Sequence, residues 1–165
     1  MAFCRQYLHR LAGLILTATR AGSDSEEARA NRDKSAELVL KEGVSSIAMG
    51  MLGRVMSPKT YHNNPKLVAE VLDIMEMTSV EGVRGALMGM KERPDSYATL
   101  KNIKVPALVI QGADDQVVPL QEAEDMKAAF PKGQLVIIPD AGHLPNLEQP
   151  ERFNQVVRNF ITTPQ

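Results

Sequence analysis

The sequence has a single cysteine, Cys4, among its 165 residues, so no disulfide can form within the chain. A lone cysteine is typical of a reducing compartment, and we therefore expect a cytoplasmic protein. No apolar run approaches the roughly 20 residues that a membrane-spanning helix needs, which argues against a membrane protein. An excess of charge is also missing, because 19 basic and 20 acidic residues leave a net charge of -1. Nothing therefore points to nucleic acid or an anionic membrane as a partner.

Histidine is scarce as well. The three histidines, His9, His62 and His143, are scattered along the chain and have no metal-ligand spacing. We therefore predict no metal site and no cofactor.

The N-terminal residues resemble a secretory signal peptide only loosely. Arg5 and Arg10 precede the apolar run Leu11–Leu16, but the run is short and Gly13 interrupts it. A buried strand explains this run better. The helix expected before it has no capping residue, so the sequence reads as if it begins inside a helix.

An apolar content of 44% suffices for one globular domain with a sizeable core. Three short apolar runs, rich in β-branched residues, have the length and composition of buried strands. These predicted strands are Leu11–Thr17, Val105–Ile110 and Gln134–Ile138. A helix from Pro119 connects the last two, which is typical of a parallel strand–helix–strand unit. A final helix follows Pro150.

Residues 23–91, between the first two strands, have a helical period instead. Four amphipathic helices are expected there, and three of their starts are marked by the capping residues Ser23, Asn64 and Thr78. A free-standing helical bundle and a lid inserted between strands of a sheet are the two interpretations of this segment.

Two neighbouring loops carry the residues suited to catalysis. Asp114 and Asp115 follow the strand Val105–Ile110, and His143 follows the strand Gln134–Ile138. In parallel sheets ligands lie beyond the carboxyl ends of the strands, and adjacent strands are about 4.8 Å apart. We therefore expect an aspartate to reach His143, hold one imidazole tautomer and stabilise its charged form.

Each of these residues also has an alternative interpretation. Asp114 is the alternative acid, although the loop pattern favours Asp115. Asp115 would otherwise cap the helix that Pro119 begins, and His143 would be an ordinary loop histidine. Cys4 has no neighbouring base, so a small buried hydrophobic residue explains it better than a nucleophile.

The two loops resemble those of the α/β-hydrolase family, whose catalytic acid lies in a G-x-x-D loop and whose histidine lies in a G-H loop. The matching positions are Asp115 and His143, and Leu147–Phe153 is similar to the family's run into its last helix. The resemblance implies Asp115 and His143 as the acid and the base of a catalytic triad.

The resemblance also implies an α/β fold class. It corresponds to the C-terminal part of an α/β-hydrolase fold, with about three parallel strands, flanking helices and an inserted four-helix cap. The expected partial core comprises residues 1–20 and 95–165, and the expected cap, or lid, comprises residues 21–94.

The G-x-S-x-G nucleophile elbow of the family does not occur in these 165 residues, and neither does its upstream H-G loop. We therefore expect a chain derived from a serine-type hydrolase of carboxylic ester or lactone bonds, inactive alone because the serine lies on a missing segment. Two alternatives are a residual binder of small molecules and a non-catalytic half-fold. The half-fold would expose an edge at Leu11–Thr17 to a second copy or to an N-terminal fragment.

Overall fold

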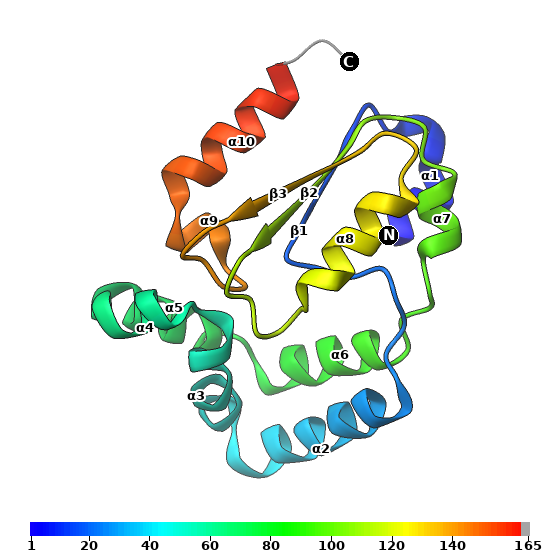
Figure 1. Cartoon of the computed structure of the whole chain (residues 1–165). Coiled ribbons are helices and arrows are strands. Elements are labelled where there is room, and N and C mark those ends of the chain that lie inside the picture. Colours follow the sequence, from blue (N-terminus) through cyan, green and yellow to red (C-terminus); the bar gives the residue numbers. More distant parts are fainter. Residues whose placement is uncertain (163–165) are drawn as a thin grey trace.

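The computed structural model describes residues 1–162 and contains a sheet of three parallel strands (Figure 1). The strands are β1 (Leu14–Thr17), β2 (Ala107–Gly112) and β3 (Gly133–Ile138), in that order across the sheet. Both pairs of neighbours are parallel, and all six residues of the central strand β2 are buried. The predicted parallel α/β fold is confirmed.

Helices cover both faces of this sheet. On one face lie α1 (Ala2–Tyr7), α7 (Tyr97–Lys101) and α8 (Leu120–Ala129), and on the other lies α10 (Pro150–Thr162). Successive side chains of a strand point to opposite faces. Val109 of β2 therefore packs in the cluster with α8, whereas Ile110 packs in the cluster with α10. Cys4 of α1 is buried in the first cluster, as expected for a small hydrophobic residue.

The first strand is shorter than the predicted strand Leu11–Thr17. Residues Leu8–Arg10 form a 3-10 helix, and pairing with β2 begins at Leu14, opposite Ala107. A β-strand requires backbone hydrogen bonds to a neighbouring strand. An apolar run in the sequence does not show at which residue these bonds begin. The prediction was wrong for residues 11–13.

Residues 21–94, called the helical block below, contain five helices beyond the carboxyl ends of the strands (Figure 1). They are α2 (Glu26–Glu42), α3 (Val44–Val55), α4 (Pro58–Asn63), α5 (Pro65–Glu76) and α6 (Val80–Lys91). The four predicted helices are present as α2, α3, α5 and α6. The additional helix α4 was missed because six residues are too few to show a helical period. The division into a core and a cap domain stays a prediction.

Two of the three predicted capping residues were displaced. Asn64 caps α5 as expected, but Ser25 rather than Ser23 caps α2, and Ser79 rather than Thr78 caps α6. Each of the three side chains accepts a hydrogen bond from the backbone N–H three residues later. Capping requires extended backbone immediately before the first turn, and sequence alone does not choose between two neighbouring hydroxyl residues.

Two short helices were missed outside the helical block. Helices α7 and α9 (Pro145–Glu148) were not predicted, since four or five residues show no period. Helix α2 has 17 residues. Among residues 1–162, none of the helices combines the length and the apolar character that crossing a membrane requires.

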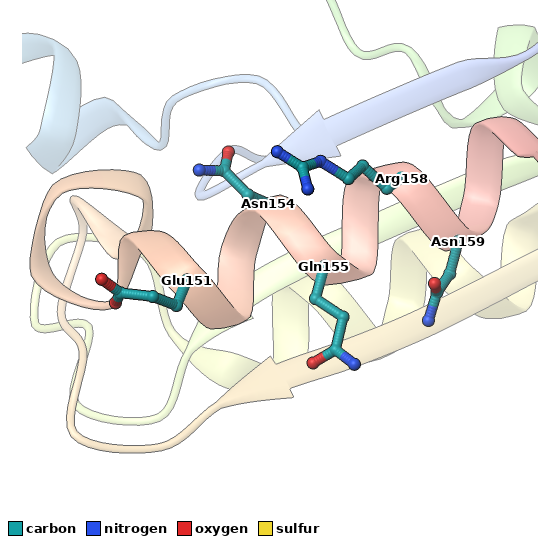
Figure 2. Close-up of a pocket in the computed structure, with 5 residues that line it drawn as sticks. All are labelled: Glu151, Asn154, Gln155, Arg158 and Asn159. Atoms are coloured by element: carbon teal, nitrogen blue, oxygen red, sulfur yellow. The ribbon is translucent and has the colours of Figure 1, made fainter.

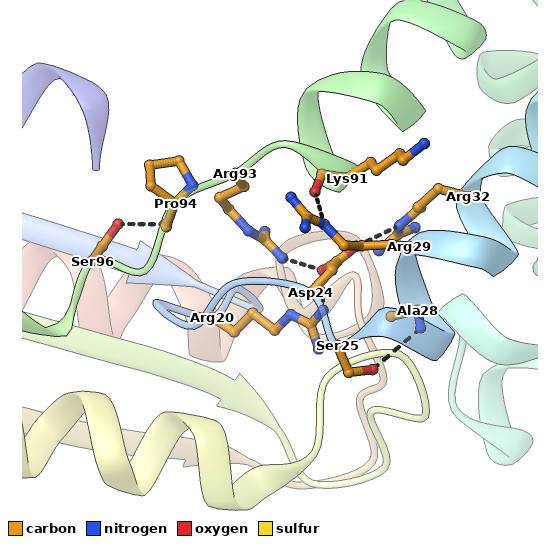
Figure 3. A network of polar contacts seen from close by, with 10 residues as sticks. All are labelled: Arg20, Asp24, Ser25, Ala28, Arg29, Arg32, Lys91, Arg93, Pro94 and Ser96. Atoms are coloured by element: carbon orange, nitrogen blue, oxygen red, sulfur yellow. Dashed lines mark hydrogen bonds and ion pairs between the residues drawn. The ribbon is translucent and has the colours of Figure 1, made fainter.

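A buried carboxylate connects the points where the chain enters and leaves the helical block (Figure 3). Asp24, just before α2, forms ion pairs with Arg20, with Arg32 at 3.0 Å and with Arg93 at 2.9 Å. The Asp24 side chain is 0% exposed, whereas the three guanidinium side chains are 22–29% exposed. Burial opposes ionisation of Asp24, but the hydrogen bonds and charges of Arg32 and Arg20 outweigh it and hold the pKa of the carboxyl below its usual 3.8.

Candidate functional site

The two predicted loops meet at the carboxyl ends of β2 and β3. These strands pair in parallel, with Gly112 opposite Ile138, so the loops that follow them begin side by side. The Nδ1 atom of His143 lies 2.9 Å from Oδ2 of Asp115. The structure thus brings together the two residues that the sequence predicted as a pair.

Asp115 is held by more than the imidazole. Its Oδ1 accepts hydrogen bonds from the backbone N–H groups of Val117 and Val118, at 2.8 and 3.0 Å. The Asp115 side chain is 1% exposed, whereas that of His143 is 26% exposed. The carboxylate is therefore fixed and dry, and the imidazole is accessible. Within residues 1–162, no group is hydrogen-bonded to Nε2 of His143.

The environment of Asp115 favours its ionised form. Burial raises the pKa of the carboxyl, but the hydrogen bonds from His143, Val118 and Val117 lower it by more, so the pKa lies below its usual 3.8. Asp115 is therefore a carboxylate at neutral pH. A carboxylate on Nδ1 retains the proton there and leaves the lone pair of Nε2 for a reacting group.

The structure distinguishes the two candidate acids. Asp114 is exposed, and its backbone N–H donates to the Ala141 carbonyl at 2.9 Å, while Asp115 alone of the two bonds His143. Asp115 also accepts hydrogen bonds from backbone N–H groups in the turn before α8, but it does not cap that helix, whose N-cap is Pro119 without a side-chain hydrogen bond. The alternative that Asp115 caps this helix was therefore wrong, and its role as the acid of a triad stays a prediction.

Two glycines permit the loops to approach this closely. A Cβ at Gly112 would lie 2.0 Å from the Gly142 carbonyl oxygen, and one at Gly142 would lie 2.8 Å from the Ser57 backbone nitrogen. Both contacts are with backbone, which cannot rotate away as a side chain can. Any larger residue at these positions would separate the loops from each other or from the helical block.

The histidine loop is attached to the helical block through Glu148 of α9. One Glu148 carboxylate oxygen accepts from Gly142 N and the other from Ser57 N, each at 2.7 Å. The His143 backbone N–H also donates to the Val55 carbonyl at 2.9 Å. The sequence-based prediction did not include Glu148, since an acid at the end of a short helix has no distinctive pattern. Its effect is to hold the backbone of His143 against α3.

Replacing Glu148 with alanine is expected to lower the free energy of unfolding by about 2 kcal/mol, because two partly buried backbone N–H groups lose charged acceptors. Urea denaturation followed by circular dichroism measures this change. The control is Glu124→Ala on the exposed side of α8, for which a change within about 0.5 kcal/mol is expected. Equal midpoints for the two variants would contradict the role assigned to Glu148.

Gln111 is a second residue that the sequence-based prediction missed. It is fully buried at the end of β2, and its Nε2 donates to Asp115 Oδ2 at 2.6 Å and to the Val118 carbonyl at 3.0 Å. These bonds orient both the acid and the loop that holds it. The available clue was a polar residue inside an otherwise apolar strand, because a buried amide needs partners.

The other candidate residues lie outside this arrangement. His9 and His62 are exposed, and neither is bonded to an acid in the described part of the chain. No three histidine, cysteine, aspartate or glutamate residues among residues 1–162 gather as metal ligands would. Asp115 and His143 form an aspartate–histidine pair, an arrangement suited to general acid–base catalysis.

A pocket of about 440 Å³ lies beside the acid loop. Val117 of that loop lines it together with residues of α2, α3 and α6. A different pocket, of about 310 Å³, is lined by α10 alone through five polar side chains (Figure 2). Neither Asp115 nor His143 lines either of these two pockets. The pocket beside Val117 is connected with the pair through Val117, whose backbone N–H donates to Asp115.

A parallel sheet that places an aspartate and a histidine on adjacent carboxyl-terminal loops defines a hydrolase-like α/β protein. Residues 4–150 match the family model described as the alpha/beta hydrolase fold. The chain therefore belongs to the α/β-hydrolase fold family, and the predicted family is confirmed.

Three known proteins illustrate the similarity. A thermophilic esterase from Thermogutta terrifontis, in a malate-bound structure, is 44% identical with a TM-score of 0.93, over 97% of this chain and 59% of that one. The enol-lactonase from Burkholderia xenovorans LB400 is 26% identical with a TM-score of 0.88, over 98% of this chain and 60% of that one. The 3-oxoadipate enol-lactonase 1 of Acinetobacter baylyi is 29% identical over 130 residues, which are 79% of this chain and 48% of that protein. The chain thus spans about half the length of this curated relative.

Proposed function

We propose that Asp115 and His143 are the acid and the base of a hydrolase of carboxylic ester or lactone bonds. The observation that carries this proposal is the 2.9 Å contact of Asp115 with Nδ1 of His143, which leaves Nε2 accessible and unbonded within residues 1–162. Similarity to an esterase and to enol-lactonases supports the choice of ester and lactone bonds.

In the proposed reaction, Nε2 of His143 takes the proton of an attacking hydroxyl while its oxygen bonds to the carbonyl carbon of the substrate. The negative charge of Asp115 stabilises the imidazolium that forms. The imidazolium then gives its proton to the leaving oxygen as the carbon–oxygen bond breaks. A water molecule repeats the sequence on the acyl intermediate and releases the acid.

The attacking hydroxyl is proposed to belong to a serine of a G-x-S-x-G elbow, a motif that these 165 residues do not contain. Strand β1 has a place for the segment that carries it, because in the described sheet β1 pairs with β2 along one edge only. Such a segment, or a second copy of this chain, would pair with the other edge.

The pure chain is expected to hydrolyse p-nitrophenyl butyrate no faster than its His143→Ala variant. Without a nucleophile and an oxyanion hole, the pair alone has no attacking group to activate. Release of p-nitrophenolate, followed by absorbance at equal protein concentrations, measures both rates. Enzyme-like turnover by the unaltered chain that is lost in the variant would show that the chain supplies its own nucleophile.

A further inference from the structure

The pocket beside Val117 has a strongly cationic lining. Arg20, Arg32 and Arg54 all line it, and neither aspartate nor glutamate is among the residues that do. Arg20 follows β1, Arg32 lies on α2 and Arg54 on α3, so three separate segments contribute an arginine to the lining of one cavity. Like charges gathered in a cavity create a field that attracts anions.

The charges within this region do not balance. Asp24 is the shared partner of Arg20, Arg32 and Arg93, so one carboxylate faces three guanidinium groups; Arg20 and Arg32 line the pocket, and Arg93 does not. Arg54 adds a further positive charge, since it forms no ion pair with any residue from 1 to 162. This excess stands out in a chain whose net charge is -1.

The rest of the lining describes the shape of a suitable ligand. Leu38, Ile47 and Leu87 provide apolar surface, while Asn31 and Ser35 provide polar groups. A guanidinium group binds a carboxylate through two parallel hydrogen bonds, which makes arginine suited to this anion. The cavity therefore fits a small molecule with an apolar body and a carboxylate.

Asp115 and His143 do not line this cavity, but residues that line it lie next to hydrogen-bond partners of the pair or are such partners themselves. Val117 donates its backbone N–H to Asp115, and Arg54 directly precedes Val55, whose carbonyl accepts from the His143 backbone. We propose that this pocket binds a carboxylate group of the substrate, so that the hydrolase acts on half-esters of dicarboxylic acids or on lactones bearing a carboxylate. The inference rests on the proposed function for the kind of bond that is cleaved. The binding of the carboxylate is argued from the lining of the pocket alone.

Binding of two matched probes to the 165-residue chain tests the inference without turnover. Monomethyl glutarate carries one carboxylate, and dimethyl glutarate replaces it with an ester of nearly the same size. We expect the monoester to bind about tenfold more tightly or better, because its carboxylate forms charge-assisted hydrogen bonds with arginine that the neutral ester of the diester cannot form. Changes in amide NMR shifts during titration measure both dissociation constants.

Arg54→Gln is the informative variant, because Arg54 forms no ion pair with another described residue, whereas Arg20 and Arg32 form ion pairs with Asp24. This variant is expected to weaken binding of the monoester about tenfold and to leave the affinity for the diester unchanged. The matched control is Arg152→Gln, an exposed arginine of α10 that does not line the pocket. Equal affinities for the two probes, or no effect of Arg54→Gln, would overturn the inference. Sulfate binding as strong as that of the monoester would overturn it too, by showing unspecific attraction of anions.

A further variant separates this inference from the proposed function. His143→Ala removes the catalytic base but leaves the arginines, so monoester binding is expected to persist within about twofold. If the unaltered chain does not prefer the monoester to the diester, the carboxylate pocket is overturned, while the proposed roles of Asp115 and His143 are unaffected. If a completed hydrolase shows no activity but the chain still prefers the monoester, the proposed function is overturned and the carboxylate pocket is kept.

Discussion

Replacing His143 with alanine in a completed hydrolase is expected to lower kcat/KM by about 10⁴-fold. The completed protein joins this chain to the segment of the Thermogutta terrifontis esterase that the chain leaves uncovered, which the 44% identity and the TM-score of 0.93 make feasible. Alanine removes the group that takes the proton from the nucleophile, while the oxyanion hole and the substrate contacts remain. Asp115→Asn is expected to have an effect of similar size, because the amide no longer favours the tautomer with an open Nε2.

Initial rates with p-nitrophenyl butyrate, over a range of substrate concentrations, measure these effects. His62→Ala, an exposed histidine of α4, is the control and is expected to retain full activity. Circular dichroism shows whether each protein is folded. A folded fusion whose rate is unchanged by either His143→Ala or Asp115→Asn would contradict the proposed roles of both residues.

Replacing Asp24 with asparagine is expected to lower the free energy of unfolding by about 2–3 kcal/mol, which corresponds to about 5–10 °C in Tm for a chain of this size. Three guanidinium groups then lose their shared anion at the junction of the helical block. The loss is smaller than the roughly 3–5 kcal/mol of a fully buried pair, because the guanidinium side chains are 22–29% exposed. Thermal unfolding followed by circular dichroism measures it.

The control is Asp33→Asn, which breaks a partly exposed ion pair with Lys91 and is expected to cost at most about 1 kcal/mol. The pH dependence gives a second test. Because folding lowers the pKa of Asp24, its contribution is present above the ordinary pKa of 3.8 and is lost as the pH falls through the lower folded value. The difference between the unaltered chain and Asp24→Asn should therefore be constant near neutral pH and shrink below about pH 4. A constant difference down to pH 2 would contradict this assignment.

The parts of the fold that depend on local pattern were predictable. Apolar runs rich in β-branched residues identified β2 and β3, although β2 begins and ends two residues later than the predicted strand Val105–Ile110. The four longer helices of the helical block have a clear period, which identified them. Predictions at the ends of elements were less accurate, as the displaced caps at Ser25 and Ser79 and the shorter β1 show. Neighbouring residues there have similar propensities, and the contacts made by the folded chain choose between them.

The sequence by itself determined the parallel strand–helix–strand unit and the pair of Asp115 and His143, because both follow from adjacent strands and the loops after them. Only the tertiary structure decided that Arg93 joins Asp24 across 69 residues and that Glu148 joins Ser57 across 91. Such contacts have no period along the chain, and a charged residue on its own does not indicate its partner. They form once packing of the apolar faces has brought distant segments together, and the cationic pocket is a consequence of the same packing.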